Sequence, residues 1–384
     1  MIWVAFGQKG RCEMKVFGIP MVVTLTLGFC LLTGADAPPA RADFTFGEPV
    51  NVRTVIPVLD PMTDVIASFS VDGLEMVLSS YRPGAYGWGD IWVSRRDSTD
   101  TDWNALEHLG LPVNDPNAQW TDPGNLSADG LELYFDSPRP DGQGGGDLYV
   151  ATRETRTSPW REAVNLGPTV NTPDHETWPW LSPNGLELYF LSNRAGGVGG
   201  FDIYVSRRAT ANDPWGDPEN LGPVVNSETE DGSVGLSPDG LLLFFADAGA
   251  PRPGGHGGTD LWMTRRVGLA APWGSPVNVG PKINGPYNDV TPRVSPDGAC
   301  LYWVWCNEDW TVFENFRAPI LPIVDFNADG TVDLDDLRLL IENWGTDNTL
   351  YDIGPYAWGD GKVDIEDLKV FIAEWEKENP PAQP

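Results

Sequence analysis

The feature of this chain that most constrains its fold is a segment that recurs five times along the sequence. The third copy reads SPNGLELYFLSNRAGGVGGFDIYVSRR, and the fifth, SPDGACLYWVWCNEDWTVFENFR, is degraded. The copies begin 57, 55, 55 and 58 residues apart, at Ser70, Ser127, Ser182, Ser237 and Ser295. A repeat of this length, built from short strands, is typical of a β-propeller or a linear array.

Within each copy, the local signals predict strands joined by turns. Asn184-Gly185 and Asp239-Gly240 are hairpin signals. An apolar strand follows each of them, then a glycine-rich loop, then another strand such as residues 202–207. A glycine-rich loop that cradles phosphate leads into a helix, whereas this loop connects two strands. The pattern therefore argues against a nucleotide site, and we expect the glycines to form a wide hairpin turn.

An arginine and an aspartate, eight residues apart, flank the glycine-rich loop in four of the copies. The pairs are Arg82 and Asp90, Arg139 and Asp147, Arg194 and Asp202, and Arg252 and Asp260. We expect each pair to close its hairpin, with the aspartate also accepting hydrogen bonds from loop N–H groups. The alternative is that these are solvated charges. Under either interpretation the aspartates are structural.

A motif led by tryptophan predicts a fourth strand for each copy. It reads WREAVNLGPTVN from Trp160, recurs from Trp215 and Trp273, and is looser in WNALEHLGLPVN from Trp103. The fifth copy lacks it, whereas FGEPVNV, at residues 46–52, stands alone before the first copy. Placing this spare strand in the last sheet closes a ring and leaves no open edge. We therefore predict an all-β, five-bladed β-propeller over residues 43–320, with four-stranded blades. An open stack would leave an apolar face uncovered.

The net charge of the chain restricts its binding partners, and its N-terminal residues indicate its cellular location. A net charge of −30 makes nucleic acid and anionic membrane surfaces poor partners. In residues 1–42, basic residues precede an apolar run, and Ala40-Arg41-Ala42 resembles a signal cleavage site. We expect a secreted or cell-surface protein with no membrane segment after cleavage. An uncleaved anchor is the alternative.

The two cysteines that follow the signal segment are expected to stay unpaired. Cys300 and Cys306 fall on one predicted strand, which separates their Cα atoms by roughly 20 Å. A disulfide requires less than about 7 Å.

After residue 320 the pattern changes from strands to acidic loops and helices. DFNADGTVDLDDL, from Asp325, matches the spacing of an EF-hand calcium loop. Its expected ligands are Asp325, Asn327, Asp329, Thr331 through its carbonyl group, Asp333 through water, and Asp336. Hard oxygen ligands at this spacing favour Ca²⁺ over softer transition metals.

A second, weaker copy of the calcium loop follows. Its expected ligands are Asp352, Asp360, Lys362, Asp364 and Asp367, but the front half is stretched by four residues and position three has no clear counterpart. We therefore expect one or two Ca²⁺ ions. Each loop precedes a helix with one apolar face, at residues 337–344 and 368–375. A unit of this size, residues 321–384, buries little core alone, so metal should contribute to its folding.

Two resemblances to known families follow from these motifs. The repeat, with NLGPTVNTPDHETWPWLS, resembles the WD-like propeller repeats of the TolB type, which implies a propeller and a binding or unassigned role. Those propellers have six blades, whereas we count five here. The duplicated calcium loop resembles the type I dockerin, which implies Ca²⁺ binding and a cohesin partner. In that family the pair after position nine contacts cohesin. Here those pairs are Leu334-Asp335 and Ile365-Glu366, not the usual small hydroxyl residues. The alternative for the tail is a calcium-stabilised module without a partner.

Two functions remain open at this point. The first is a non-enzymatic propeller that binds a polysaccharide or a cell-envelope protein, with Trp120, Trp178 and Trp180 as a stacking platform or as packing between blades.

The alternative is a polysaccharide-degrading glycosidase or lyase, which requires two carboxylates that flank the bond to be cleaved. The candidate carboxylates precede each repeat serine by six residues: Asp64, Glu176, Asp231 and Asp289, with Thr121 in the second copy. Because they recur with the repeat, we expect them to be structural, and we assign no catalytic residue. His175 stands beside Glu176, and the histidines have no zinc-site spacing.

Overall fold

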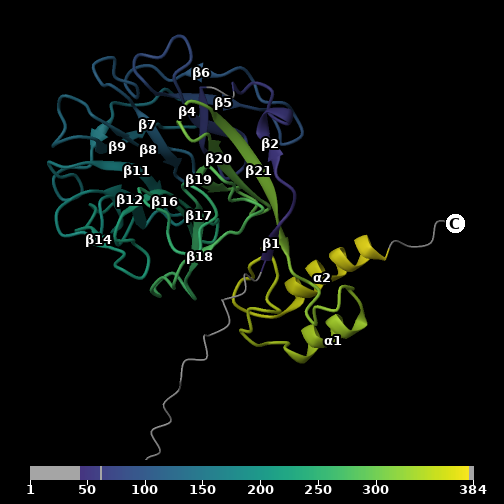
Figure 1. Cartoon of the computed structure of the whole chain (residues 1–384). Coiled ribbons are helices and arrows are strands. Elements are labelled where there is room, and N and C mark those ends of the chain that lie inside the picture. The colour runs from purple at the N-terminus through teal and green to yellow at the C-terminus, as the bar shows by residue number, and fades with distance from the viewer. Residues whose placement is uncertain (1–43, 61–62, 380–384) are drawn as a thin grey trace, which may run out of the picture. The chain divides into compact units, whose positions relative to one another are not determined.

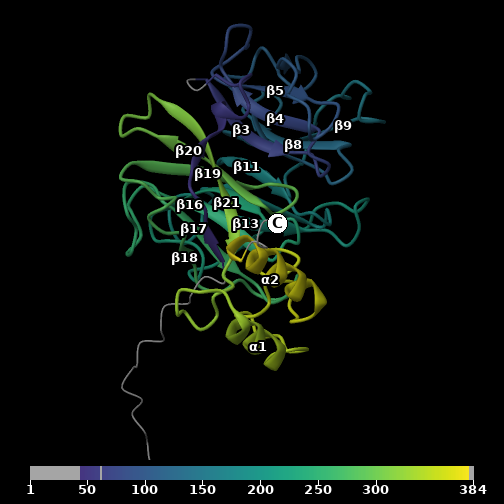
Figure 2. The same cartoon turned by 90° about the vertical axis from the view of Figure 1, so that its right-hand side faces the viewer.

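The computed structural model describes residues 44–60 and 63–379. The expected signal segment, residues 1–42, lies outside this part of the chain. The described residues form five antiparallel sheets, which are arranged as blades about a common centre (Figures 1 and 2). Among these residues, the longest helix is too short and too polar to cross a membrane.

Four of the blades are consecutive four-stranded sheets. Blade one holds β3 (Asp64–Phe69), β4 (Glu75–Ser80), β5 (Asp90–Arg95) and β6 (Glu107–His108). Blade two holds β7 (Asp122–Leu126), β8 (Glu132–Ser137), β9 (Asp147–Thr152) and β10 (Val164–Asn165). Blade three holds β11 (Glu176–Leu181), β12 (Glu187–Ser192), β13 (Asp202–Arg207) and β14 (Glu219–Asn220). Blade four holds β15 (Glu230–Leu236), β16 (Leu242–Ala248), β17 (Leu261–Arg265) and β18 (Val277–Asn278).

The fifth blade is built from both ends of the propeller sequence. It holds β19 (Asn288–Val294), β20 (Cys300–Cys306) and β21 (Phe313–Pro322), and its outer edge is completed by β1 (Phe44–Phe46) and β2 (Val50–Asn51). A short 3₁₀ turn, Val52–Thr54, follows β2. Phe46 pairs with Ile320, and Val50 pairs with Arg317, so the purple β2 lies beside the green β21 in Figure 1. This confirms that the N-terminal segment closes the last sheet.

The ring is closed around its axis as well. The innermost strands β3, β7, β11, β15 and β19 contact one another in turn, and β19 also contacts β3. The predicted five-bladed β-propeller is therefore confirmed. Cys300 and Cys306 stand at opposite ends of β20 and are both free, as expected from their separation along one strand.

Ion pairs join neighbouring blades in addition to the apolar core. Arg153 of blade two binds both carboxylate oxygens of Glu75 in blade one, at 3.0 and 2.5 Å. Its guanidinium also stacks over Trp160, 4.3 Å from the ring centroid. Blades two and three are joined by Arg208 and Glu132, and blades three and four by Arg266 and Glu187. In blades two, three and four, the tryptophan of the fourth-strand motif thus covers an inter-blade arginine.

The predicted arginine–aspartate hairpin pairing is not the one that the structure shows. Arg82, Arg194 and Arg252 instead bind the carboxylates that begin the inner strands, Asp64, Glu176 and Asp231 respectively. In blade two the corresponding position is Thr121, and Arg139 donates to the backbone carbonyls of Pro112 and Val113. The aspartates Asp90, Asp147, Asp202 and Asp260 each accept a loop N–H, from Tyr86, Gln143, Val198 and His256 respectively. In three of the four blades the arginine therefore binds the buried carboxylate of the inner strand, while the aspartate of the predicted pair accepts a loop N–H.

The C-terminal residues form two loop–helix units. The helices are α1 (Leu334–Glu342) and α2 (Ile365–Glu378), and each begins with a capping box, from Asp333 to Asp336 and from Asp364 to Asp367. Leu340 and Phe371 are buried in a shared apolar cluster. Part of the predicted apolar face is not covered: the side chains that remain exposed are Ile341, Trp344, Ile372 and Trp375.

The four extra residues of the second loop, Pro355 to Trp358, connect this region to the propeller. Trp358 is fully buried in a cluster with Phe44 and Phe46 of β1. Its indole N–H donates to Asp239 at 2.7 Å, and its carbonyl accepts a hydrogen bond from Arg265 at 2.6 Å. The stretch that weakens the calcium-loop pattern is therefore a packing element against blades four and five.

Candidate functional site

A central pocket opens on the propeller axis and draws residues from every blade. Its volume is about 490 Å³. The inner strands contribute Val65, Asp122, Trp178, Glu230 and Thr291, one from each blade. Because strands from all five blades meet here, a ligand in this pocket would contact the whole ring.

Each inner strand is irregular where it passes the pocket. All five pair with their neighbours through a register shift, which lies between Thr177 and Trp180 in β11 and between Val290 and Arg293 in β19. Such bulges turn side chains out of the regular alternation. Trp178 and Thr291 stand in these bulges with φ of 50° and 57°, a conformation that is costly for residues with a side chain. Strained residues of this kind are concentrated at functional sites.

Three exposed tryptophans surround the pocket. Trp88, from the glycine-rich loop of blade one, is 79% exposed. Trp178, from β11, is 39% exposed, and Trp310, from the β20–β21 loop, is 47% exposed. Trp310 also has a positive φ, of 54°. Exposed aromatic faces are unusual on a soluble protein, and around a cavity they offer stacking surfaces for a ligand.

Two aspartates lie beside the pocket in blade two, the half-buried Asp122 and the fully buried Asp136. Asp122 of β7 and Asp136 of β8 are directly opposite each other in the antiparallel pair. Asp122 accepts a hydrogen bond from Ser79 at 2.8 Å. Burial and the nearby Asp122 carboxylate raise the pKa of Asp136 to about 8, and burial also raises the pKa of Asp122. Burial and the neighbouring carboxylate therefore favour the protonated form of Asp136 near neutral pH.

Asp136 also organises the aromatic wall. One oxygen accepts the backbone N–H of Trp178 at 2.8 Å, and the other accepts the indole N–H of Trp120 at 3.2 Å. Asp136 itself is fully buried, whereas Asp122 lines the pocket. Of the pair, Asp122 is the one that faces a ligand, and Asp136 holds Trp178 in its left-handed conformation.

Arg293 divides the channel beneath the pocket. Its side chain lines the central pocket and also a second cavity toward the opposite mouth. The guanidinium donates to the carbonyls of Ala67 and Val234, both at 2.5 Å, and stacks over Trp180 at 4.6 Å. Burial lowers its pKa to about 9. The pocket therefore has a cationic floor, and the channel is not an open tube.

The carboxylates proposed from the repeat do not line the pocket. Asp64, Glu176 and Asp231 are buried and bound to arginines, and Asp289 accepts the indole N–H of Trp303 at 2.9 Å. These positions are structural, as their recurrence indicated. Of the predicted platform, Trp178 lines the pocket, Trp120 lies behind it, and Trp180 packs in the core. His175 accepts an N–H from Gly146 and lies outside the pocket lining.

The pocket residues that sequence reasoning missed share one signal, which is that each breaks the repeat. Trp88 aligns with Gly145, Gly200 and Gly258 of the other copies. Asp122 aligns with Val65, Thr177, Gly232 and Val290. Comparing the copies position by position, and retaining the exceptions at the inner strands, would have selected these residues. The recurring residues build the ring, and the exceptions line its pocket.

The two acidic loops share one hydrogen-bond pattern. Asp325 accepts N–H groups from Asp329 and Gly330, and Asp352 does the same from Asp360 and Gly361. The third position of the calcium loop is Asn327 in the first loop. In the second loop it is Gly354, which has no side chain to ligate a metal ion. In the described residues, no three acidic, histidine or cysteine side chains are arranged to hold a metal ion. By its all-oxygen donor set, the first loop is the better fit to Ca²⁺.

Comparisons with known proteins give structural likeness only. Neither a family model nor a curated protein matches the sequence. A structure described as a putative TolB from Agrobacterium tumefaciens is 19% identical, with 69% of this chain and 79% of that chain covered and a TM-score of 0.41. An alpha-L-arabinofuranosidase from Lactobacillus brevis is 15% identical, with 70% and 94% covered and a TM-score of 0.46. Another, from Podospora anserina in complex with cellotriose, is 11% identical, with 73% and 98% covered and a TM-score of 0.44. Likenesses this weak carry no activity over to this chain, and the propeller is assigned from its strand pairing.

Proposed function

We propose that this chain is an exported glycan-binding propeller whose central pocket stacks the rings of a polysaccharide. The observation that carries the proposal is the set of three exposed tryptophans, Trp88, Trp178 and Trp310, around one pocket. They come from blades one, three and five, so they were not placed there by the repeat. Indole faces bury the apolar faces of sugar rings, and polar neighbours such as Ser79 and Thr259 supply hydrogen bonds.

A polysaccharide binding screen with matched tryptophan variants tests this function. Trp178→Ala and Trp310→Ala should each weaken binding by about tenfold or more, since stacking and burial are lost. Trp344→Ala is the control, because that tryptophan is similarly exposed, at 45%, but belongs to the C-terminal region. Binding that is unaffected by both pocket variants, or the absence of any glycan ligand, would reject the proposal. Repeating the screen in EDTA assigns metal-independent binding to the propeller.

Hydrolysis of the bound glycan is the second candidate. Asp122 and Glu230 line the same pocket from blades two and four, and neither belongs to a recurring acidic position. The raised pKa of Asp122 suits a general acid, and the exposed Glu230 suits a base or nucleophile. Hydrolysis products that are lost in Asp122→Asn, with glycan binding retained, would favour the enzyme. Binding without products would favour the non-enzymatic function.

For the C-terminal region we propose Ca²⁺ binding and attachment to a partner protein. The first acidic loop supplies the ligands, with Asp325, Asn327, Asp329 and Asp336 contributing side-chain oxygens. The exposed apolar side chains Ile341 and Trp344 recur as Ile372 and Trp375 on the second helix. Such a duplicated apolar surface supports a protein partner of the cohesin type. A pull-down with a cohesin module, with and without EDTA, tests this attachment.

A further inference from the structure

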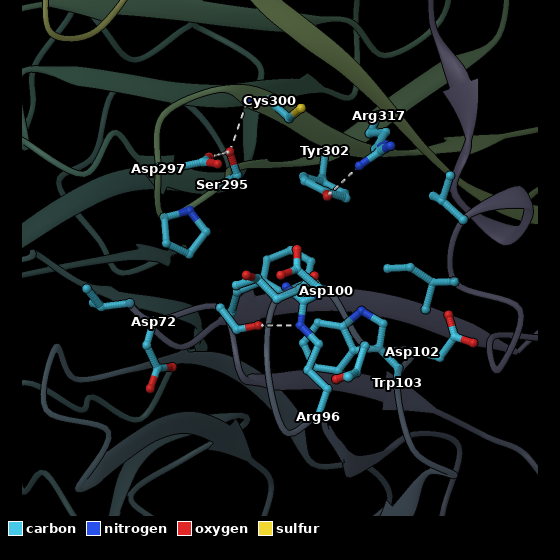
Figure 3. A pocket seen from close by; sticks show the side chains of 18 residues that line it. Asp72, Arg96, Asp100, Asp102, Trp103, Ser295, Asp297, Cys300, Tyr302 and Arg317 are labelled. Atoms are coloured by element: carbon cyan, nitrogen blue, oxygen red, sulfur yellow. Dashed lines mark hydrogen bonds between the residues drawn. The ribbon is translucent and has the colours of Figure 1, made fainter.

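Another pocket, distinct from the central pocket and from the cavity beyond Arg293, lies where the ring closes, between blade one and blade five (Figure 3). Its volume is about 470 Å³. Arg96 and Trp103 line it from blade one, and Cys300, Tyr302 and Arg317 line it from blade five. Comparison with the other blade junctions explains why this space exists.

At three junctions, an arginine after the third strand binds a glutamate at the start of the preceding blade's second strand. The pairs are Arg153 with Glu75, Arg208 with Glu132, and Arg266 with Glu187. Counted from the repeat serine, the glutamate position becomes Leu242 in blade four and Cys300 in blade five. Leu242 packs in one apolar cluster with Ile320 of blade five, so that junction is sealed without charges. Cys300, in contrast, does not belong to that apolar cluster.

The arginine that faces Cys300 is Arg96, which occupies the same repeat position as Arg153. It keeps the contacts that orient its equivalents: it donates to the Gly73 carbonyl at 2.8 Å and stacks over Trp103 at 4.5 Å. It also donates to the carbonyl of Thr99 at 3.1 Å. Among the described residues, however, Arg96 has no ion pair. The guanidinium is thus held in place to receive a carboxylate that the chain does not provide.

The rest of the lining is compatible with an anionic group. Arg317, on the blade-five wall, contacts the Tyr302 hydroxyl at 3.5 Å and has no ion pair with any described residue. Of the nearby acids, Asp72 is bound to Arg156, and Asp297 accepts the Ser295 hydroxyl and the Ala299 N–H. Asp100 and Asp102 also line the pocket, but both are exposed, so water and salt screen their charges.

We propose that this closing-junction pocket binds the carboxylate of a uronic acid residue, with Arg96 as its principal partner. The assignment of a sugar rests on the proposed glycan-binding function, whereas the carboxylate follows from the blade comparison. The cavity is larger than the missing glutamate side chain, and Phe69 and Tyr302, 5.0 Å apart, form an aromatic wall for a ring. Guanidinium and carboxylate form a charge-assisted pair that discriminates strongly against neutral sugars.

The test uses two ligands that differ only in the charged group. A tri-galacturonide and its carboxyl-reduced counterpart are titrated calorimetrically into the full chain. We expect the galacturonide to bind at least about tenfold more tightly. Cys300→Glu should abolish this preference, because the new carboxylate would occupy Arg96 as Glu75 occupies Arg153. Cys300→Ser is the matched control and should retain it.

Arg96→Gln provides an independent arm, since it leaves the pocket open and removes the charge. It should lower galacturonide affinity by about tenfold or more and leave the neutral ligand unaffected. Equal binding of both ligands, or a preference that survives both Arg96→Gln and Cys300→Glu, would overturn the proposal. A glutamate-rich peptide that competes better than the galacturonide would overturn it in favour of a protein ligand. Neutral-glycan binding that is lost in Trp178→Ala but kept in Cys300→Glu reports separately on the central pocket.

Discussion

At the scale of single residues, Asp136 joins the framework of the ring to its pocket. Its carboxylate accepts the backbone N–H of Trp178 and the indole N–H of Trp120, so one buried group positions two aromatic residues. Burial, together with the adjacent Asp122 carboxylate, raises the pKa of Asp136 and favours its protonated form. The geometry of the aromatic wall is therefore coupled to a proton.

This proton predicts a pH dependence of stability. The pKa of Asp136 is raised from 3.8 to about 8, so the folded chain holds a proton that the unfolded chain releases above about pH 4. Its contribution to stability is complete at low pH and is lost as the pH rises toward 8. The free energy of unfolding should therefore fall over this window, and Asp136→Asn should reduce the slope. Urea unfolding at several pH values measures it.

Asp72 supplies the control for that experiment. The Arg156 guanidinium holds the pKa of Asp72 below its usual range, which is the opposite direction. Asp72→Asn should therefore leave the slope between about pH 4 and pH 8 unchanged. A slope that is the same in wild type and Asp136→Asn would show that Asp136 is not protonated in the folded chain.

The buried inter-blade ion pair predicts a large loss on removal of one partner. Arg153 is fully buried and Glu75 nearly so. Glu75→Gln leaves the guanidinium without its counter-charge and should destabilise the chain by about 3–5 kcal/mol. Glu219→Gln, which breaks an exposed pair with Arg207, should cost less than about 1 kcal/mol. Denaturant midpoints of the two variants measure the difference, and equal midpoints would contradict it.

At the scale of strands and turns, the regular parts were predictable because they recur. Turn signals and apolar alternation in each copy located the four strands, and the missing motif of the fifth copy located the closing strand. The partner of Arg82 was not predictable in the same way. Sequence spacing places it near Asp90, whereas strand pairing brings it to Asp64. The bulges that hold Trp178 and Thr291 also leave no local sequence signal. Both residues have a positive φ, which tryptophan and threonine rarely adopt, so their identity does not predict it.

The closing strand makes its own prediction. Phe44 and Phe46 are buried, whereas Thr45 between them is exposed. Phe46→Ala should cost about 3–5 kcal/mol through lost burial and the cavity left behind. Thr45→Ala should change stability by no more than about 0.5 kcal/mol. Thermal unfolding compares the two, and similar behaviour of both variants would mean that the strand does not seal the last blade.

At the scale of the whole molecule, the recurring residues and the exceptions have different tasks. The recurring residues form the strands, the inter-blade ion pairs and the tryptophans that stack on their arginines. Trp88 and Asp122 line the central pocket, and Cys300 lines the closing-junction pocket. In the C-terminal region, the exception is the four-residue stretch that ends in Trp358 and packs against the propeller. A resemblance to duplicated calcium loops describes the shared hydrogen bonds, but not this added contact.

The unequal loops predict one strong calcium site. Asp325→Asn should remove most Ca²⁺ binding, because the first loop has side-chain oxygens at positions one, three and five. Asp352→Asn should leave the tighter binding event intact, since Gly354 contributes no ligand in the second loop. Calorimetric titration of Ca²⁺ into both variants measures this. Two equal sites in the wild-type chain would contradict the prediction.

The pairing of β1 and β2 with β21 has a consequence for biosynthesis. The two halves of the last sheet are separated by nearly the whole propeller sequence, so the ribosome must finish blade five before the first strands find their partner. Until then, the nascent chain carries an unmatched edge at each extremity. The ring therefore cannot close before β21 has been synthesised, and a chain interrupted before β21 would retain both edges.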